Sequence, residues 1–267
     1  MCKVLVPIGY GLNCDDETVY AFKMVGAEVK KIFLKDLISD PQILDNYQIL
    51  AMIGGFSYGD HIAAGKVLAN IYKYEIGETI QRFISDGKLI FGECNGFQAL
   101  VKAGILPGLN GNYHTQCATL TYNDSGIFED RWVKLKINPK SNCVFTKNIE
   151  ELYLPVRHGE GKFIVEKKTD LEKLKEKNLI VLQYADVETL KPTMKYPQNP
   201  NGSIESIAGI CDCTGRIFGK MPHATAYLSP YNHPRWTRQK LKGSLPKEGG
   251  GVQIFRNAVE YVNNNLT

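Results

Sequence analysis

Short apolar runs alternate with amphipathic segments along the first hundred residues of the chain. The apolar runs predict strands at 2–8, 29–34, 48–53 and 89–91, most of them ended by glycine or a polar residue. Apolar residues at helical spacing predict helices after Asn13, over 64–85 and over 94–103. Asn13 is expected to cap the first of these helices. Strands and helices that alternate in this way predict a parallel sheet wrapped by helices.

The second half of the chain changes character, because short strands follow one another with little helix between them. We predict strands at 118–122, 132–137, 153–156, 163–165, 180–184, 207–211 and 217–221, a surface helix at 169–178, a loop at 191–203 and a last helix after Gly251. We find neither an internal repeat nor a linker. The pattern therefore predicts one α/β domain over 1–267, with a mostly parallel sheet flanked by helices and an antiparallel extension.

Composition narrows the class of protein further. Hydrophobic residues make up 43% of the 267 residues, and the net charge of +4 is too small to indicate nucleic acid or a membrane surface as a partner. No apolar run is long enough to span a bilayer, and the first strand begins so early that no signal peptide is expected. Seven scattered cysteines indicate free thiols and a cytoplasmic location.

The most informative segment is the turn Gly92-Glu93-Cys94-Asn95-Gly96, which joins a predicted strand to a predicted helix. This pattern is a nucleophile elbow with a thiol, in which a sharp bend holds the reactive side chain above the sheet. A helix N-terminus favours the thiolate, and the Asn95 backbone N–H is expected to form half of an oxyanion hole. The alternative is a buried structural cysteine beside two turn glycines.

A glycine-rich segment, 54–61, directly follows the third predicted strand. Because ligands gather where parallel strands end, its backbone N–H groups at Gly55 and Phe56 are candidates for the other half of the oxyanion hole. Taken alone, the segment is also consistent with an ordinary strand-to-helix turn. The sequence contains no phosphate-binding loop and no complete dinucleotide fingerprint, so no nucleotide site is predicted.

A thiol nucleophile needs a base, and His223 is the best placed of the five histidines. It follows the predicted strand 217–221 at the rim of the sheet, where it could take the proton of Cys94 and later return it. A structural histidine is the alternative. Cys211 and Cys213 supply only half of a zinc site, so no metal site is predicted.

Together these segments resemble the class I glutamine amidotransferases, and among them the PurQ-type glutaminase subunits of phosphoribosylformylglycinamidine synthase. The matching motifs come in the family's order, and the more specific of them are GGFSYGD at 54–60, CNGFQ at 94–98, HGEG at 158–161, NPNGS at 199–203 and MPH at 221–223. The resemblance implies a flavodoxin-like fold of the amidotransferase type. Cys94 would attack the glutamine amide with His223 as base and acid, and Gln98, His158 and Gly159 would bind the glutamine.

The same resemblance implies partners. Ammonia released from glutamine would pass to a PurL-type synthetase subunit, accompanied in some members by a small PurS-type subunit. The synthetase uses ATP and Mg²⁺ to make formylglycinamidine ribonucleotide in purine synthesis. No cofactor is expected on this chain, and the isolated chain is expected to be a poor glutaminase.

The sequence departs from the family at one important position. The family usually carries a glutamate two residues after the catalytic histidine, but Thr225 stands there in this chain. Either another acid takes over, with Glu93, Glu160 and Glu205 as unranked candidates, or the enzyme works as a Cys–His dyad, which we favour. Glu93 is also unusual as the residue before the nucleophile, because its charge should raise the pKa of the thiol.

Two further possibilities remain open at this level. The segment 226–251 is longer than in short family members, and its aromatic and basic residues fit either a solvated loop or a docking surface for the synthetase. The chain as a whole could also be a non-catalytic subunit that keeps the fold for assembly, or a stand-alone cysteine hydrolase.

Overall fold

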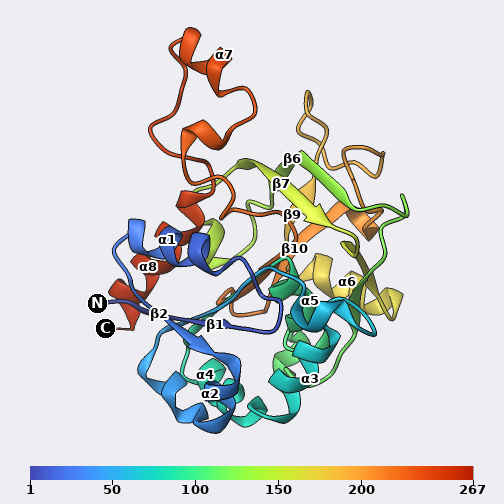
Figure 1. Ribbon diagram of the computed structural model, residues 1–267. Coiled ribbons are helices and arrows are strands. Elements are labelled where there is room, and N and C mark those ends of the chain that lie inside the picture. Colours follow the sequence, from blue (N-terminus) through green and yellow to red (C-terminus); the bar gives the residue numbers. More distant parts are fainter. Residues whose placement is uncertain (267) are drawn as a thin grey trace.

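A nine-stranded sheet runs through the centre of the computed structural model, which describes residues 1–266 (Figure 1). Its strand order is β2-β1-β3-β4-β11-β10-β9-β6-β7. The strands are β1 (Lys3–Ile8), β2 (Glu28–Phe33), β3 (Ile49–Met52), β4 (Leu89–Glu93), β6 (Glu129–Ile137), β7 (Glu151–His158), β9 (Ile180–Tyr184), β10 (Ile207–Cys211) and β11 (Ile217–Lys220). A separate two-stranded sheet pairs β5 (Ala118–Thr121) with β8 (Lys162–Val165).

Helices cover both faces of the large sheet. They are α1 (Asp15–Met24), α2 (Leu34–Ser39), α3 (Lys66–Tyr74), α4 (Gly77–Ser85), α5 (Asn95–Lys102), α6 (Lys168–Glu176), α7 (Trp236–Leu241) and α8 (Val252–Asn265). The strands from β2 to β11 pair in parallel, and those from β11 to β7 pair antiparallel. The predicted parallel sheet with an antiparallel extension is therefore confirmed.

Two local predictions were wrong. The single helix predicted over 64–85 is two helices, because Ile76 leaves the helical region at φ −127° and Gly77 starts α4. The break turns the apolar side of each helix inward, so that Tyr72 and Phe83 are both buried. The expected cap of α1 by Asn13 is not formed, because Cys14 occupies the N-cap position without a side-chain bond to the helix.

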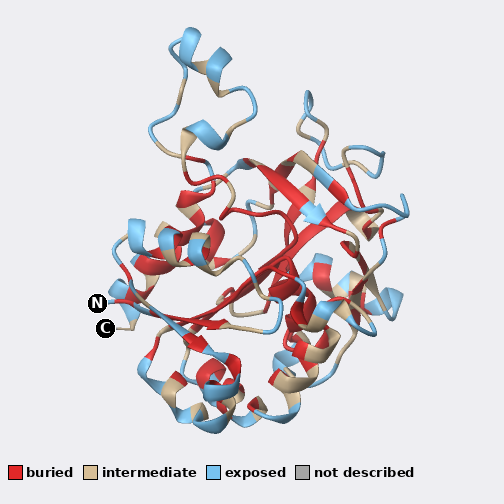
Figure 2. Cartoon of the chain, in the orientation of Figure 1, coloured by how far each residue is buried: buried red, intermediate tan, exposed pale blue. Residues whose placement is uncertain are grey.

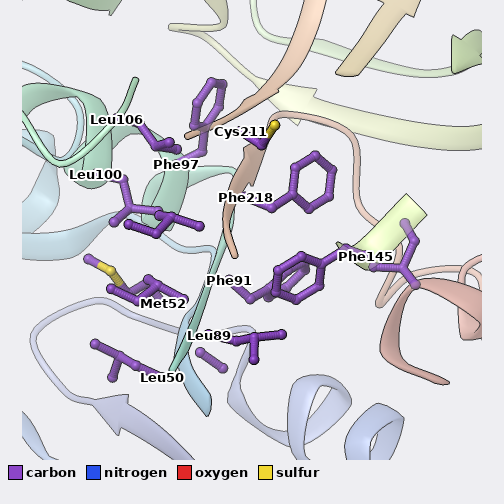
Figure 3. Packing of buried hydrophobic residues seen from close by; sticks show 14 of the residues in the cluster. Leu50, Met52, Leu89, Phe91, Phe97, Leu100, Leu106, Phe145, Cys211 and Phe218 are labelled. Atoms are coloured by element: carbon purple, nitrogen blue, oxygen red, sulfur yellow. The ribbon is translucent and has the colours of Figure 1, made fainter. Parts of the chain in front are cut away.

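The core packs against both faces of β4. On one face Phe91 contacts Phe22 of α1 and Phe255 of α8, with ring centroids 6.3 and 5.5 Å away, and Figure 3 shows it beside Phe145 and Phe218. On the other face glycines in β4 and β11 let α5 approach, since a Cβ at Gly219 would lie 2.1 Å from the Phe97 ring. Burial of aromatic groups on both faces fixes the height of α5 above the sheet.

A mostly exposed arm, residues 229–247, projects from this body and carries α7 at its tip (Figures 1 and 2). A cavity of about 950 Å³ separates the arm from α1. Among residues 1–266, none of the helices combines the length and the apolar character that a membrane crossing requires.

Replacing Phe91 by alanine tests this account of the core. Because the ring is fully buried among four other phenylalanines, Phe91→Ala should lower the free energy of unfolding by about 3–5 kcal/mol. Urea denaturation followed by circular dichroism measures the change. The matched control Phe33→Ala, at a residue 55% exposed, should cost less than about 1 kcal/mol. Equal losses in the two variants would contradict the packing described.

Candidate active site

Cys94 lies in a strained turn between β4 and α5. Its backbone adopts φ 51° and ψ −107°, a conformation that residues other than glycine rarely take. The glycine two residues later makes the turn possible, because a Cβ at Gly96 would lie 1.9 Å from the carbonyl oxygen of Met52. The geometry is that of the predicted nucleophile elbow.

The predicted base lies beside this nucleophile. A Cβ built on Gly54 would be 3.2 Å from Cε1 of His223, 3.5 Å from Cβ of Cys94 and 3.0 Å from Sγ of Cys14, so these three side chains surround one point at the end of β3. The Nε2 atom of His223 is buried and has no hydrogen-bond partner. A buried, unpaired imidazole nitrogen beside a thiol is available to accept its proton.

Burial governs the charge of both groups. Burial, reinforced by the charge of Glu93, raises the pKa of the Cys94 thiol to about 12, although the Asn95 N–H lowers it. Burial lowers the pKa of His223 to about 4, although the charge of Glu93 opposes this. Burial and the charge of Glu93, whose effect was expected from the sequence, therefore outweigh the helix N-terminus, and near neutral pH the pair is a neutral thiol beside a neutral imidazole.

A buried carboxylate lies behind the imidazole. Oε1 of Glu93 is 3.6 Å from Nδ1 of His223 and accepts a hydrogen bond from the Thr225 hydroxyl, while Oε2 accepts from Nζ of Lys220 and from the Ala224 N–H at 2.8 Å. Burial would raise the pKa of Glu93, but the charge of Lys220, the hydrogen bonds from Lys220 and Thr225 and the charge that His223 carries when protonated hold it below its usual range. Glu93 is thus an anion inside the protein.

The other two candidate acids lie elsewhere. The carboxylate of Glu160 accepts from the Ala64 N–H at 3.1 Å and lies 3.6 Å from Nζ of Lys102. Glu205 pairs with Lys175 on the surface at 2.6 Å. The Thr225 hydroxyl donates to Glu93, so this residue helps to hold the carboxylate and is not the direct partner of the histidine.

A pocket of about 190 Å³ opens above the nucleophile. Six of the nine site residues predicted from the sequence line it, namely Gly55, Phe56, Cys94, Gln98, His158 and Gly159, whereas Asn95, His223 and Thr225 are not among its lining residues. The rest of the lining consists of Asp60, Ala64, Tyr122, Phe128, Arg157 and the candidate acid Glu160. Its polar groups include one cationic and two acidic side chains. Across residues 1–266 no group of three or more His, Cys, Asp or Glu side chains is arranged to hold a metal ion.

Two of the predicted glutamine-binding residues are held rigidly. The Gln98 amide donates to the Glu160 carbonyl at 2.6 Å and accepts from the Asn95 amide at 3.0 Å. Asn123 donates through its amide nitrogen to two carbonyls, so its oxygen must accept from Nδ1 of His158, 3.1 Å away. This assigns the Nδ1–H tautomer to His158 and leaves its buried Nε2 as an unused acceptor.

The oxyanion hole is only partly formed. The Asn95 N–H is close enough to the Cys94 sulfur to lower the pKa of the thiol. The Phe56 N–H instead donates to the Gly11 carbonyl at 2.8 Å. Gly55 supports this loop with φ 147°, where a Cβ would lie 2.6 Å from the Gly11 oxygen. The role expected for Gly55 and Phe56 stays a prediction, and it requires the bond between Phe56 and Gly11 to open.

Sequence reasoning missed Lys220, Asp60, Arg157 and Cys14. Lys220 could have been found from the sequence, because it is a single charged residue at the end of the apolar strand β11. Glu93 likewise ends the apolar strand β4 beside it. Asp60 belongs to the motif at 54–60 that was already recognised, but its contact with the Asn95 amide at 3.1 Å required the fold. For Arg157 and Cys14 no local signal existed.

Comparison with known proteins places the chain in a family. The CobB/CobQ-like glutamine amidotransferase domain matches residues 1–262. The chain is 47% identical over 259 residues to phosphoribosylformylglycinamidine synthase subunit PurQ of Dehalococcoides mccartyi, with 97% of each chain covered. It is 42% identical over 270 residues to the same subunit of Methanococcus maripaludis, with 98% of this chain and 97% of the relative covered.

A solved structure agrees. A chain in the structure of PurLQS from Thermotoga maritima superposes with a TM-score of 0.70 at 27% identity, covering 98% of this chain and 99% of that one. The chain therefore belongs to the class I glutamine amidotransferases and, within them, to the PurQ subunits of phosphoribosylformylglycinamidine synthase, the glutaminase subunits of purine biosynthesis.

Proposed function

We propose that Cys94 of this subunit hydrolyses glutamine through a glutamyl thioester, with His223 as base and acid, and that the ammonia passes to a synthetase partner. The observation that carries the proposal is the convergence of Cys94 and His223 on Gly54, with Nε2 of the histidine unpaired. The partner, rather than this chain, would bind ATP and Mg²⁺ and make formylglycinamidine ribonucleotide.

The chemistry follows from the neutral resting pair. His223 Nε2 takes the thiol proton as the Cys94 sulfur forms a bond to the amide carbon of glutamine, and the carbonyl oxygen becomes an oxyanion near the Asn95 N–H. The tetrahedral intermediate collapses when the imidazolium gives its proton to the departing nitrogen, so that ammonia leaves. Nε2 of His223 then removes a proton from water, and the resulting hydroxide attacks the thioester carbon. The Cys94 sulfur leaves and regains a proton from the imidazolium, and glutamate is released.

The pocket suits a zwitterionic amino acid. The Arg157 side chain can pair with the α-carboxylate of glutamine, and the carboxylate of Asp60 can pair with the α-ammonium. The unused Nε2 acceptor of His158 adds a site for a substrate N–H. An acyl donor without these charges could not form the two ion pairs, which disfavours its binding relative to glutamine.

A partner subunit is proposed to close the mouth of the pocket. Phe56, Tyr122 and Phe128 line the pocket and are also exposed, and the adjacent Ile127 is 56% exposed. Exposed aromatic and aliphatic side chains around a polar pocket are typical of a protein interface. We propose a PurL-type synthetase here, with a small PurS-type subunit in the assembly, by analogy with the solved PurLQS structure from Thermotoga maritima.

Docking of this partner also provides a reason for low activity of the isolated chain. The Phe56 N–H is bonded to Gly11 in the free chain, and Phe56 itself belongs to the proposed interface. A partner that moves Phe56 could release this N–H for the oxyanion. The basic arm at 229–247 is a second surface that such a partner could contact.

Removing the nucleophile tests the proposed function. In the complex with its synthetase subunits, Cys94→Ala should lower glutamine-dependent product formation on the order of 10³-fold or more, because no thioester can form. Activity supported by ammonium salts should remain at the wild-type level. Unchanged glutamine-dependent activity in Cys94→Ala would refute the proposal.

The pH dependence of alkylation tests the state of the thiol. Because burial raises the pKa of Cys94 to about 12, its reaction with iodoacetamide in the isolated chain should rise about tenfold per pH unit from about pH 7 to about pH 9.5. A model thiol with pKa of about 8.5 levels off in this range. Peptide mass spectrometry separates Cys94 from the other six cysteines, and a plateau below about pH 8 would contradict the description.

A charge introduced at the mouth of the pocket tests the proposed interface with the synthetase. Ile127→Glu should raise the dissociation constant of the complex about tenfold or more, because the carboxylate would be desolvated against the partner. Isothermal titration calorimetry measures the change. The control Tyr74→Glu, at an exposed residue that ends α3, should leave the constant unchanged. If both variants bind like the wild type, this face is not the interface.

A further inference from the structure

We propose that Glu93 positions the catalytic base of this enzyme, as a carboxylate supplied by the nucleophile's own strand. The inference rests on the proposed function, because it concerns how His223 acts on Cys94. It replaces the dyad that the sequence favoured by a three-residue arrangement. Glu93 would not touch the substrate, so it is a positioning residue.

The first argument is which nitrogen the carboxylate faces. Oε1 of Glu93 lies 3.6 Å from Nδ1 of His223, whereas Nε2 is the nitrogen left without a partner. A carboxylate beside Nδ1 favours the tautomer that carries its proton there. That tautomer leaves the lone pair on Nε2, which is the form that can accept the proton of Cys94.

The second argument is that the carboxylate is built into place. Lys220, Ala224 and Thr225 each donate to it, and all three belong to β11 or the segment that directly follows it and carries His223. Two donors occupy Oε2, while Oε1 has one donor and therefore keeps acceptor capacity toward Nδ1. The carboxylate and the imidazole are thus fixed to the same short segment.

The third argument concerns charge during the reaction. His223 becomes an imidazolium when it takes the thiol proton, in a place where burial disfavours that charge. The anion of Glu93 is the nearest compensating charge given by the structure, and Lys220 keeps it ionised at rest. Lys220 of β11 and Arg157 of β7 act against the charge of His223, Asp130 of β6 favours it, and His158 of β7 is a further titratable group that interacts with it.

Kinetics of the assembled complex test the inference. Glu93→Gln should lower kcat for glutamine hydrolysis about 10- to 100-fold. The imidazolium of His223 would lose its counter-charge, and the Nδ1–H tautomer would lose the carboxylate that favours it. The KM for glutamine should change less than about twofold, since Glu93 is not among the residues lining the pocket. Activity supported by ammonium salts should stay at the wild-type level, because it bypasses this site.

A second variant guards against a folding defect. Glu93→Gln leaves Lys220 buried without its counter-ion, so the double variant Glu93→Gln/Lys220→Met removes both charges together. It should show the same loss of kcat while still binding the synthetase subunits. Glu205→Gln is the matched control, because its carboxylate pairs only with Lys175 at the surface, and its kcat should equal the wild type.

The outcomes separate this inference from the proposed function. Wild-type kcat in either Glu93 variant would overturn the positioning role while leaving Cys94 as the nucleophile. A rise in KM with unchanged kcat would also overturn it, because that pattern indicates a binding role. If the wild-type complex itself used no glutamine, the proposed function would fail first.

Discussion

The pairing of β4 with β11 is the constraint on which the site depends. Their parallel register places Lys220 opposite Glu93, and the Cys94 N–H donates to the Lys220 carbonyl at 2.8 Å. The nucleophile and the base therefore leave the sheet from the ends of adjacent strands. A slip of one residue would turn Lys220 to the other face and separate it from Glu93.

The buried pair of Glu93 and Lys220 is costly, and the positioning role proposed for Glu93 gives a reason for it. Taking two charges out of water is often less favourable than filling the same space with apolar side chains. Here Glu93 also raises the pKa of the thiol beside it, although Lys220 opposes this, and a raised pKa works against nucleophilicity at rest. The Glu93 carboxylate gains a favourable electrostatic interaction with His223 only when the imidazole becomes positively charged, and that occurs during the reaction.

The free chain has the features of an enzyme at rest. Its thiol and imidazole are both neutral, the N–H of the proposed oxyanion donor Phe56 is bonded to Gly11, and apolar side chains around the pocket are exposed to solvent. Each feature is expected to limit glutamine hydrolysis before a partner is present. A glutaminase that feeds a synthetase benefits from this arrangement, because ammonia released into bulk water is lost to the partner.

The sequence by itself determined most of the strands and the elbow, and it was enough to single out the proposed nucleophile and base. These features are local: an apolar run, two glycines around Cys94, and His223 directly after a strand. The long helix at 64–85 was mispredicted, because the change of direction at Ile76 depends on packing against the sheet.

Tertiary structure alone decided which acid lies beside the imidazole. The sequence alone does not distinguish Glu93, Glu160 and Glu205 as partners of the base, and Glu93 is 130 positions before His223 in the chain. Only the pairing of β4 with β11 brings the Glu93 carboxylate to the imidazole. For the thiol, the sequence predicted that the adjacent Glu93 raises its pKa, but the larger cause is desolvation by distant segments, which only the fold shows.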